Sequence, residues 1–243
     1  IFHLMKIYYL LFYTLFAIKI ALSQTSFNYG VVNFDVVKKI NVGDQNVSKV
    51  FRGSNLSSLK GIVGSPYRND YFQSGIIYRE KDSVKTYLRY NGLNDEIEIS
   101  LTKDATSSTN ALIKSNSISC KIKNDFFVYE EFIDENKSKN KGYLIKAYSG
   151  KKYSLYVRDK KVFRDGEKAK NSLENDKPPK FINKQTIFIQ YASDLPKPIK
   201  LKYKKISESI AIEDKSKFAK LKNSYKKINS LDRLISLIST LDK

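Results

Sequence analysis

An Arg, two Tyr, two Asn, an Asp and two Glu lie close to one Gly in the stretch VKTYLRYNGLNDEIEISL, residues 84–101. The binding candidates in this stretch are Arg89, Tyr90, Asn91, Asp95 and Glu96. Asn94, Asp95 and Glu96 could supply oxygen ligands for a hard cation, or Glu96 and Glu98 could act as an acid and a base. A calcium site takes about six to eight oxygens, however, and the stretch contains no EF-hand loop. We therefore expect no metal site and name no catalytic residue.

The same residues also suit a turn between two antiparallel strands. A four-residue loop over 91–94 pairs Arg89 with Glu96 and sets the apolar residues of both strands against each other. Gly92 tolerates the positive φ that such turns require. In this hairpin Arg89, Glu96 and Glu98 share the solvent face. The turn explains the polar cluster without a ligand. A ligand site at the same residues stays open as the alternative interpretation.

Side chains needed for several kinds of catalysis are scarce. The chain has one His, one Met, one Cys and no Trp. His3 precedes the only Met, so a chain processed beyond that Met has no His for a Ser-His-Asp, Cys-His or His-zinc site. Cys120 is in phase with Ile118 and Ile122, which predicts a buried, inert thiol. No phosphate-binding or dinucleotide-binding glycine motif is present, and we expect no cofactor.

The N-terminal segment has the features of a secretory signal peptide. A basic start at Met5 is followed by an apolar run from Ile7 to Ile18, and Ala21 and Ser23 form a small-residue cleavage site. The alternative is a membrane anchor, which needs about 20 apolar residues. The run is shorter than that and Lys19 interrupts it. We therefore expect cleavage after Ser23, export to the periplasm, outer cell envelope or exterior, and no integral membrane protein afterwards.

The chain is strongly basic, with a formal net charge of +19. The predicted signal peptide holds two Lys and no acidic residue, so the mature chain would carry +17. Such a charge favours anionic partners, and we expect an envelope protein or an anionic glycan or lipid. Nucleic acid is not favoured, because Lys far outnumbers Arg, whose fork suits phosphate recognition better.

Short strand-forming segments dominate the middle of the chain. They are FQSGIIYRE, VKTYLRY, DEIEISL, SISCKIK, FFVYEEF, GYLIKAY, KKYSLYVRD, TIFIQYA and IKLKYKK. These segments are rich in β-branched and aromatic residues. Hairpin turns are expected between them at 123–125 and 148–150. The pattern predicts a mainly β fold: an antiparallel, meander-type sheet forming a barrel or a sandwich, with a C-terminal helical pair (α+β overall).

Two segments depart from the strand pattern. The charged stretch 160–185 is expected to form a long loop or crossover. Near the C-terminus, apolar residues recur at helical spacing from Phe218 to Ile228 and again over 231–241, with Ser230 as the cap of the second helix. The expected parts of the chain are a signal peptide (1–23), a variable lead-in (24–60), an antiparallel β domain (61–205) and C-terminal amphipathic helices (206–243).

An ordered set of motifs runs through residues 61–243. It comprises GSPYRNDYF from Gly64 to Phe72, LRYN from Leu88 to Asn91, DEIE from Asp95 to Glu98, ISC from Ile118 to Cys120 and GYLIK from Gly142 to Lys146. By these motifs the chain resembles a family of uncharacterised exported bacterial proteins with a signal peptide, a variable lead-in and a helical tail. The resemblance implies export and a shared β fold, and it implies no activity.

Three hypotheses of function remain from the sequence. The first is an exported, non-enzymatic β domain that binds a ligand or partner in the cell envelope. The second is a carboxylate-based envelope hydrolase, which would need two converging carboxylates in a cleft. The third is a binder of acidic polymers through the basic surface, which would need clustered lysines.

Overall fold

The structure is a computed structural model that describes residues 59–106, 110–171 and 173–243. The predicted signal peptide and nearly all of the predicted lead-in lie outside the described residues, so both stay predictions. Within the described ranges, no helix combines the length and the apolar character needed to cross a bilayer.

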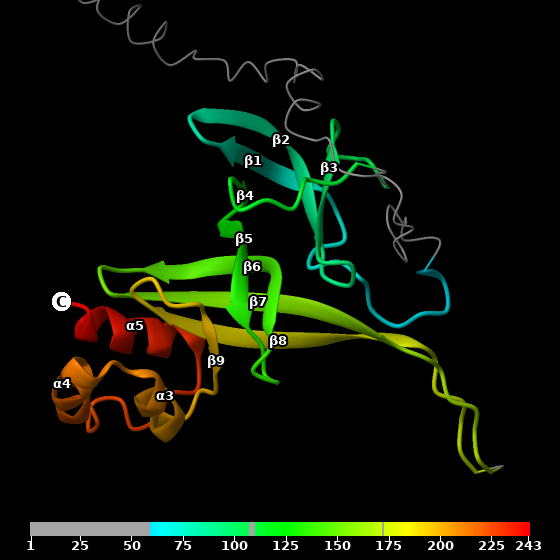
Figure 1. The fold of residues 1–243 in the computed structure, drawn as a ribbon. Helices are drawn as coiled ribbons and strands as arrows, with labels where there is room; N and C mark the ends of the chain where they lie inside the picture. The colour runs from blue at the N-terminus through cyan, green and yellow to red at the C-terminus, as the bar shows by residue number, and fades with distance from the viewer. Residues whose placement is uncertain (1–58, 107–109, 172) are drawn as a thin grey trace, which may run out of the picture. The chain divides into compact units, whose positions relative to one another are not determined.

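The described residues form one antiparallel sheet of nine strands (Figure 1). The strands are β1 (Gln73–Arg79), β2 (Asp82–Asn91), β3 (Glu96–Ser100), β4 (Ile118–Ile122), β5 (Asp125–Ile133), β6 (Lys139–Ser149), β7 (Tyr153–Arg164), β8 (Lys180–Tyr191) and β9 (Lys197–Ile199). Their order across the sheet is β3-β2-β1-β4-β5-β6-β7-β8-β9. Each strand therefore lies beside the next one in sequence, except at the connection from β3 to β4.

This architecture confirms the prediction of a mainly β, antiparallel, meander-type fold. The edge strands β3 and β9 do not pair with each other, so the sheet stays open and the closed-barrel alternative is not found. Hairpin turns lie near both expected positions. Lys123 adopts a φ of 51° in the turn between β4 and β5, although Asp125 already belongs to β5. The turn between β6 and β7 covers residues 150–152 rather than 148–150, because β6 continues to Ser149, and the Gly150 N–H donates to the Tyr153 carbonyl at 2.9 Å.

A buried cluster on β5 to β8 forms part of the core. It consists of Val128, Phe132, Leu144, Tyr156 and Phe188. The rings of Phe132 and Phe188 meet edge to face at 5.1 Å between centroids, so β5 and β8 are in contact although two strands lie between them in the sheet order. The Ile133 N–H also donates to the Pro196 carbonyl at 2.9 Å, which ties the end of β5 to the β8–β9 loop.

Strands β7 and β8 extend beyond the rest of the sheet as a long two-stranded arm (Figure 1). Their pairing continues to Arg164 opposite Lys180, so the prediction of a long loop or crossover over 160–185 is only partly correct: the connection between the strands starts at 165 and ends at 179. The sequence concealed this because the arm is rich in charge. Cross-strand contacts stabilise it instead, including the ring pair of Phe163 and Phe181 at 5.3 Å between centroids.

Three α-helices follow the sheet in the described part of the chain: α3 (Tyr203–Ser209), α4 (Lys215–Lys220) and α5 (Leu231–Leu241). Helix α5 confirms the prediction, and the Ser230 side chain accepts from the Arg233 N–H at 3.2 Å as its cap. The strand expected through IKLKYKK, residues 199–205, is wrong beyond its first residue, because β9 ends at Ile199 and helix α3 begins at Tyr203, with Ile206 buried one turn further on.

The expected helix over 218–228 is also only partly correct, since α4 starts at Lys215 and ends at Lys220. Phe218 and Ile228 are both buried, but residues 221–225 between them form turns instead of continuing the helix. The expected boundary between residues 205 and 206 falls inside α3. Apolar spacing therefore identified the correct inward-facing residues and overestimated the length of one helix.

Two buried aspartates fasten the helices to the β6–β7 turn. Asp214 accepts from the Tyr153 hydroxyl at 2.9 Å and from Lys152 Nζ at 3.0 Å. Asp242 accepts from the Lys152 N–H at 2.7 Å and from the Tyr148 hydroxyl at 3.0 Å. Burial raises the pKa of Asp214, but the hydrogen bonds from Lys152 and Tyr153 outweigh burial and hold it below the ordinary value of 3.8.

Replacing Asp214 by Asn should loosen the helices from the sheet. Because the folded-state pKa is lowered, the carboxylate stabilises the fold above its unfolded-state pKa and loses that effect as the pH falls through the folded-state value. We expect Asp214→Asn to cost about 1–3 kcal/mol at pH 7 and clearly less near pH 3, as measured by urea unfolding. Glu208→Gln, in an exposed pair with Lys205, is the control. A loss that does not change with pH would contradict this assignment.

Candidate functional site

Strands β6 and β7 pair over only part of their length and then diverge as a fork. Their pairing runs from Ser149 opposite Ser154 to Ile145 opposite Val157. Further from the β6–β7 turn, residues 139–144 of β6 and the end of β7 are not paired with each other. Backbone N–H groups on the inner edges of this fork need other partners, because unpaired buried backbone groups are costly.

The turn between β2 and β3, residues 92–95, supplies those partners. The Gly92 carbonyl accepts from the Lys161 N–H of β7 at 3.0 Å. The Asp95 carboxylate accepts from the Tyr143 N–H of β6, with both oxygens at 3.3 Å. One short turn therefore bonds to both strands of the fork, β6 and β7.

Three further residues position the Asp95 carboxylate. Its Oδ1 accepts from the Tyr90 hydroxyl at 2.7 Å, and its Oδ2 accepts from Arg158 Nη2 at 3.3 Å. Gly142 makes room for this carboxylate, since a Cβ at that position would lie 2.4 Å from Asp95 Oδ2. Burial, followed by the charge of Asp95, raises the pKa of Tyr90 well above 10.0, so this phenol stays a hydrogen-bond donor.

Arg89 and Glu98 form a buried ion pair on the neighbouring part of the hairpin, with exposed fractions of 1% and 0%. Arg89 Nη2 and Nε donate to Glu98 Oε2 at 2.7 and 3.2 Å, and Nη1 donates to the Asp70 carbonyl at 2.9 Å. The guanidinium lies 3.6 Å from the ring centroid of Tyr67 and 4.3 Å from that of Phe72. The charge is therefore enclosed by two rings and matched by one carboxylate.

The remaining candidate residues complete this buried network. Asn91 Nδ2 donates to Glu98 Oε1 at 3.2 Å, and Asn91 Oδ1 accepts from the N–H groups of Leu93 and Asn94 at 3.1 and 3.2 Å. Glu96 is buried as well, at 2% exposure. The structure thus brings all five sequence-predicted binding residues together, and it uses their polar atoms within the protein.

Two details of the predicted hairpin are wrong. The loop spans 92–95 rather than 91–94, and Arg89 lies opposite Glu98 rather than Glu96. A slip of two residues keeps every side chain on the same face, so apolar and charge patterns could not distinguish the two registers. The predicted solvent face is also buried, because the segment before β1 covers it through Tyr67 and Phe72 rather than leaving it open.

The segment GSPYRNDYF positions this covering layer. The Gly92 N–H donates to the Pro66 carbonyl at 2.9 Å, and the Arg68 N–H donates to the Tyr90 carbonyl at 3.0 Å. The Arg68 side chain then binds Asp125 at 2.9 Å and also pairs with Asp159. Four of the motifs singled out in the sequence, GSPYRNDYF, LRYN, DEIE and GYLIK, therefore meet at the fork.

Little space for a ligand remains beside the five predicted binding residues. Arg89 and Tyr90 line a cavity of about 10 Å³. A single ordered water needs at least about 10–15 Å³. The predicted binding residues thus stabilise the fold, and a ligand site has to be sought elsewhere on the sheet.

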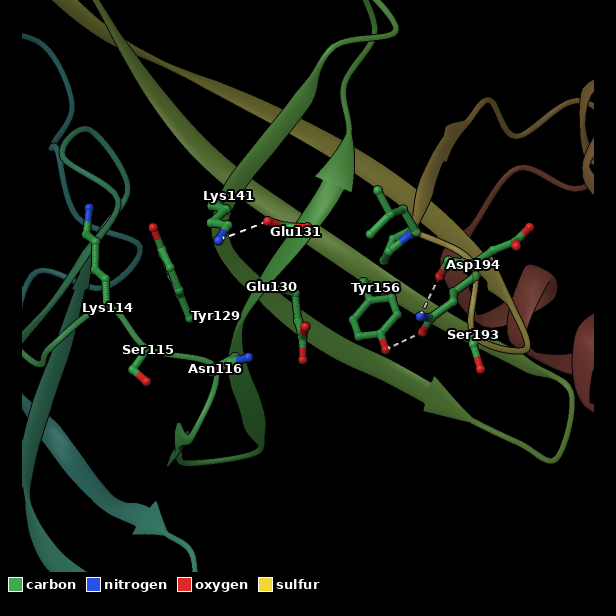
Figure 2. A pocket seen from close by; sticks show the side chains of 13 residues that line it. Lys114, Ser115, Asn116, Tyr129, Glu130, Glu131, Lys141, Tyr156, Ser193 and Asp194 are labelled. Atoms are coloured by element: carbon green, nitrogen blue, oxygen red, sulfur yellow. Dashed lines mark hydrogen bonds and ion pairs between the residues drawn. The ribbon is translucent and has the colours of Figure 1, made fainter.

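A groove of about 690 Å³ lies on strands β5, β6, β7 and β8 (Figure 2). Its lining residues are Lys114, Ser115, Asn116, Tyr129, Glu130, Glu131, Lys141, Tyr156, Gln190, Ser193, Asp194, Leu195 and Pro196. We call it the Glu130 groove. Sequence reasoning missed it, because FFVYEEF indicated only a strand and its lining comes from segments far apart in the chain.

Most charged groups of the Glu130 groove already have partners. Glu131 pairs with Lys141 at 2.9 Å, and Asp194 lies 3.5 Å from Lys197. Glu130 is different: it is partly buried, and its carboxylate has no hydrogen bond or ion pair with any described residue. Burial raises its pKa above 4.5, although the nearby charge of Lys146 acts in the opposite direction.

Two tyrosines accompany Glu130 in the groove (Figure 2). The Tyr156 hydroxyl donates to Gln190 Oε1 at 2.8 Å, and Gln190 Nε2 donates to the Asp194 carbonyl at 2.8 Å. Burial raises the pKa of Tyr156, and the charge of Glu130 raises it further. The groove therefore offers the ring of Tyr129, amide and hydroxyl groups, and the Glu130 carboxylate, which accepts no hydrogen bond from a described residue.

Comparisons with family models, curated proteins and solved structures found no match to this chain. Within the described residues, no group of three or more His, Cys, Asp or Glu side chains is arranged to hold a metal ion. Cys120 is buried, and burial raises the pKa of its thiol.

Breaking the Arg89–Glu98 pair should be costly, whereas removing both charges should cost less. We expect Arg89→Met to destabilise the fold by about 3–5 kcal/mol, because it leaves a buried carboxylate without its cation. The double variant Arg89→Met, Glu98→Leu should recover part of that loss in denaturant unfolding. Lys141→Met, in the exposed pair with Glu131, is the control and should cost about 0–1 kcal/mol. Equal losses for Arg89→Met and Lys141→Met would contradict a structural role for the buried pair.

Proposed function

We propose that this protein is an exported, non-enzymatic β domain that binds a saccharide in the Glu130 groove. The observation that carries the proposal is the partly buried Glu130 carboxylate, which lacks a partner among the described residues and lines a groove with two tyrosines. Ligand sites are typically concave and combine aromatic side chains with a few polar groups that fix orientation.

The chemistry of the groove suits a hydroxyl-rich ligand. Sugar hydroxyls can donate to the Glu130 carboxylate and accept from lysine or amide N–H groups, and hydrogen bonds to a charged group are the stronger kind. Tyr129, which is only partly buried, supplies a ring against which the apolar C–H face of a sugar can pack. The lining carries both acidic and basic side chains, which favours a ligand with donors and acceptors over a purely ionic one.

Glu130 also reduces the stability of the folded domain near neutral pH. Its folded-state pKa is raised, so the group favours folding below its unfolded-state pKa and loses that contribution as the pH rises through the folded-state value. A carboxylate kept in such an environment supports a functional role, since functional sites commonly cost stability.

A carboxylate-based hydrolase is less well supported by this geometry. Glycoside hydrolysis uses two carboxylates, one as the acid and one as the base or nucleophile. In the Glu130 groove, Glu131 is held by Lys141 and Asp194 lies near Lys197, which leaves Glu130 alone. We therefore propose binding rather than cleavage.

Export is the second part of the proposal, and it rests on the sequence. The segment from Met5 to Ser23 has the order of charge, apolar run and small residues that a signal peptide has. The motifs that resemble a family of exported bacterial proteins support the same location, in the periplasm, outer envelope or exterior. An envelope domain with a groove for sugars would meet its ligand there.

The test is saccharide binding by ligand-observed NMR, with oligomers of N-acetylglucosamine and of glucose as probes. We expect at least one oligomer to bind, and Glu130→Gln to weaken binding about tenfold or more. The same variant should be more stable than the parent at pH 7, because it removes a carboxylate with a raised pKa. Glu135→Gln, in an exposed pair with Lys184, is the matched control and should change neither property. Unchanged affinity of Glu130→Gln, or no binding of any probe, would contradict the proposal.

A further inference from the structure

The helical part of the chain contains a dense cluster of lysines. Between Lys215 and Lys227 there are six lysines in 13 residues and no acidic residue. Five of them are exposed, and one of these, Lys217, donates to the Leu241 carbonyl at 2.8 Å, which leaves Lys220, Lys222, Lys226 and Lys227. None of these four has an ion pair with a described residue, so their charge is not balanced locally.

Packing brings the start of α3 beside this segment. The ring of Tyr203 stacks on that of Phe218 at 4.6 Å between centroids, and its hydroxyl donates to the Phe218 carbonyl at 2.9 Å. Lys202 and Lys204 flank Tyr203 in the sequence and are exposed. Helices α3 and α4 accordingly lie side by side (Figure 1). We call the group the tail lysines: Lys202, Lys204, Lys220, Lys222, Lys226 and Lys227.

Acidic side chains of the same region are mostly engaged elsewhere. Asp214 and Asp242 are buried against the β6–β7 turn, and Glu213 accepts from the Tyr191 hydroxyl of β8. Glu208 pairs with Lys205. Only the exposed Asp232 has no such partner among the described residues. The carboxylates thus hold the helices to the sheet, whereas the tail lysines face solvent.

We propose that the tail lysines bind a linear acidic polysaccharide. Clustered lysines attract a polyanion without requiring the fixed fork geometry that arginine gives. This site is distinct from the Glu130 groove, since the two share no lining residue. The proposal therefore stands or fails independently of the saccharide proposed for that groove.

Other anionic partners fit the surface less well. Binding to a bilayer uses apolar side chains that insert between lipids, but Phe218, Ile228 and the apolar face of α5 are buried. Ile212 is the one large apolar side chain exposed in the described helical segment. Single-stranded nucleic acid binds through exposed aromatic rings, whereas Tyr203 is stacked on Phe218 and Tyr225 lies under Arg233.

Two variants of equal net charge test the proposal, with heparin as the probe. The tail variant is Lys220→Gln, Lys222→Gln, Lys226→Gln and Lys227→Gln. The control variant is Lys81→Gln, Lys121→Gln, Lys168→Gln and Lys170→Gln, which changes exposed lysines of the sheet and the arm. We expect heparin affinity in about 0.15 M salt to fall at least tenfold in the tail variant and less than twofold in the control. The tail variant should also show a shallower dependence of affinity on salt, because fewer counterions are released.

A third variant separates charge from folding: Lys→Arg changes at the same four tail positions should keep heparin affinity within about threefold. Glu130→Gln should leave heparin binding by the tail unchanged. Equal losses in the tail and control variants would overturn the proposal, because they would indicate a diffuse effect of net charge. Tighter binding of phosphatidylglycerol vesicles or of an oligo-dT strand than of heparin, at the same salt, would also overturn it.

Discussion

The divergence of β6 from β7 is the constraint on which much of the structure depends. A strand that leaves its partner exposes backbone donors that must be satisfied, and here the β2–β3 turn provides the acceptors. Gly92 bonds to β7 and Asp95 bonds to β6, so the turn joins two parts of the sheet that the strand order separates. Tyr90, Arg158 and the small Gly142 then fix the Asp95 carboxylate in place.

This constraint explains why the most polar stretch of the sequence is structural. Arg89 and Glu98 are buried beside the turn, and the rings of Tyr67 and Phe72 enclose the guanidinium. Burying an ion pair is costly unless its remaining donors and acceptors are matched, and here the backbone of Asp70 and the Asn91 side chain match them. The proposed ligand site centres instead on Glu130, whose carboxylate has no such partners among the described residues.

Sequence patterns predicted what depends on local periodicity. The alternation of strand residues located β1 to β8, and the spacing of apolar residues with Ser230 located α5. Patterns failed where tertiary contacts determine the structure. Two registers of the β2–β3 hairpin place the same side chains on the same faces, and the contacts of the turn with the fork distinguish the observed register from the other. The Glu130 groove was beyond reach for the same reason, because its lining combines segments from Lys114 to Pro196.

Amide hydrogen exchange at Tyr143 and Lys161 measures whether the β2–β3 turn bridges the fork, since their N–H groups face the fork and bond to this turn. If the turn bridges the fork, both amides exchange as slowly as paired amides within the sheet. Asp95→Ala should then accelerate exchange at Tyr143 more than at Lys161, because Lys161 bonds to the Gly92 carbonyl instead. Exchange of both amides at the rate of exposed turn residues would contradict the account.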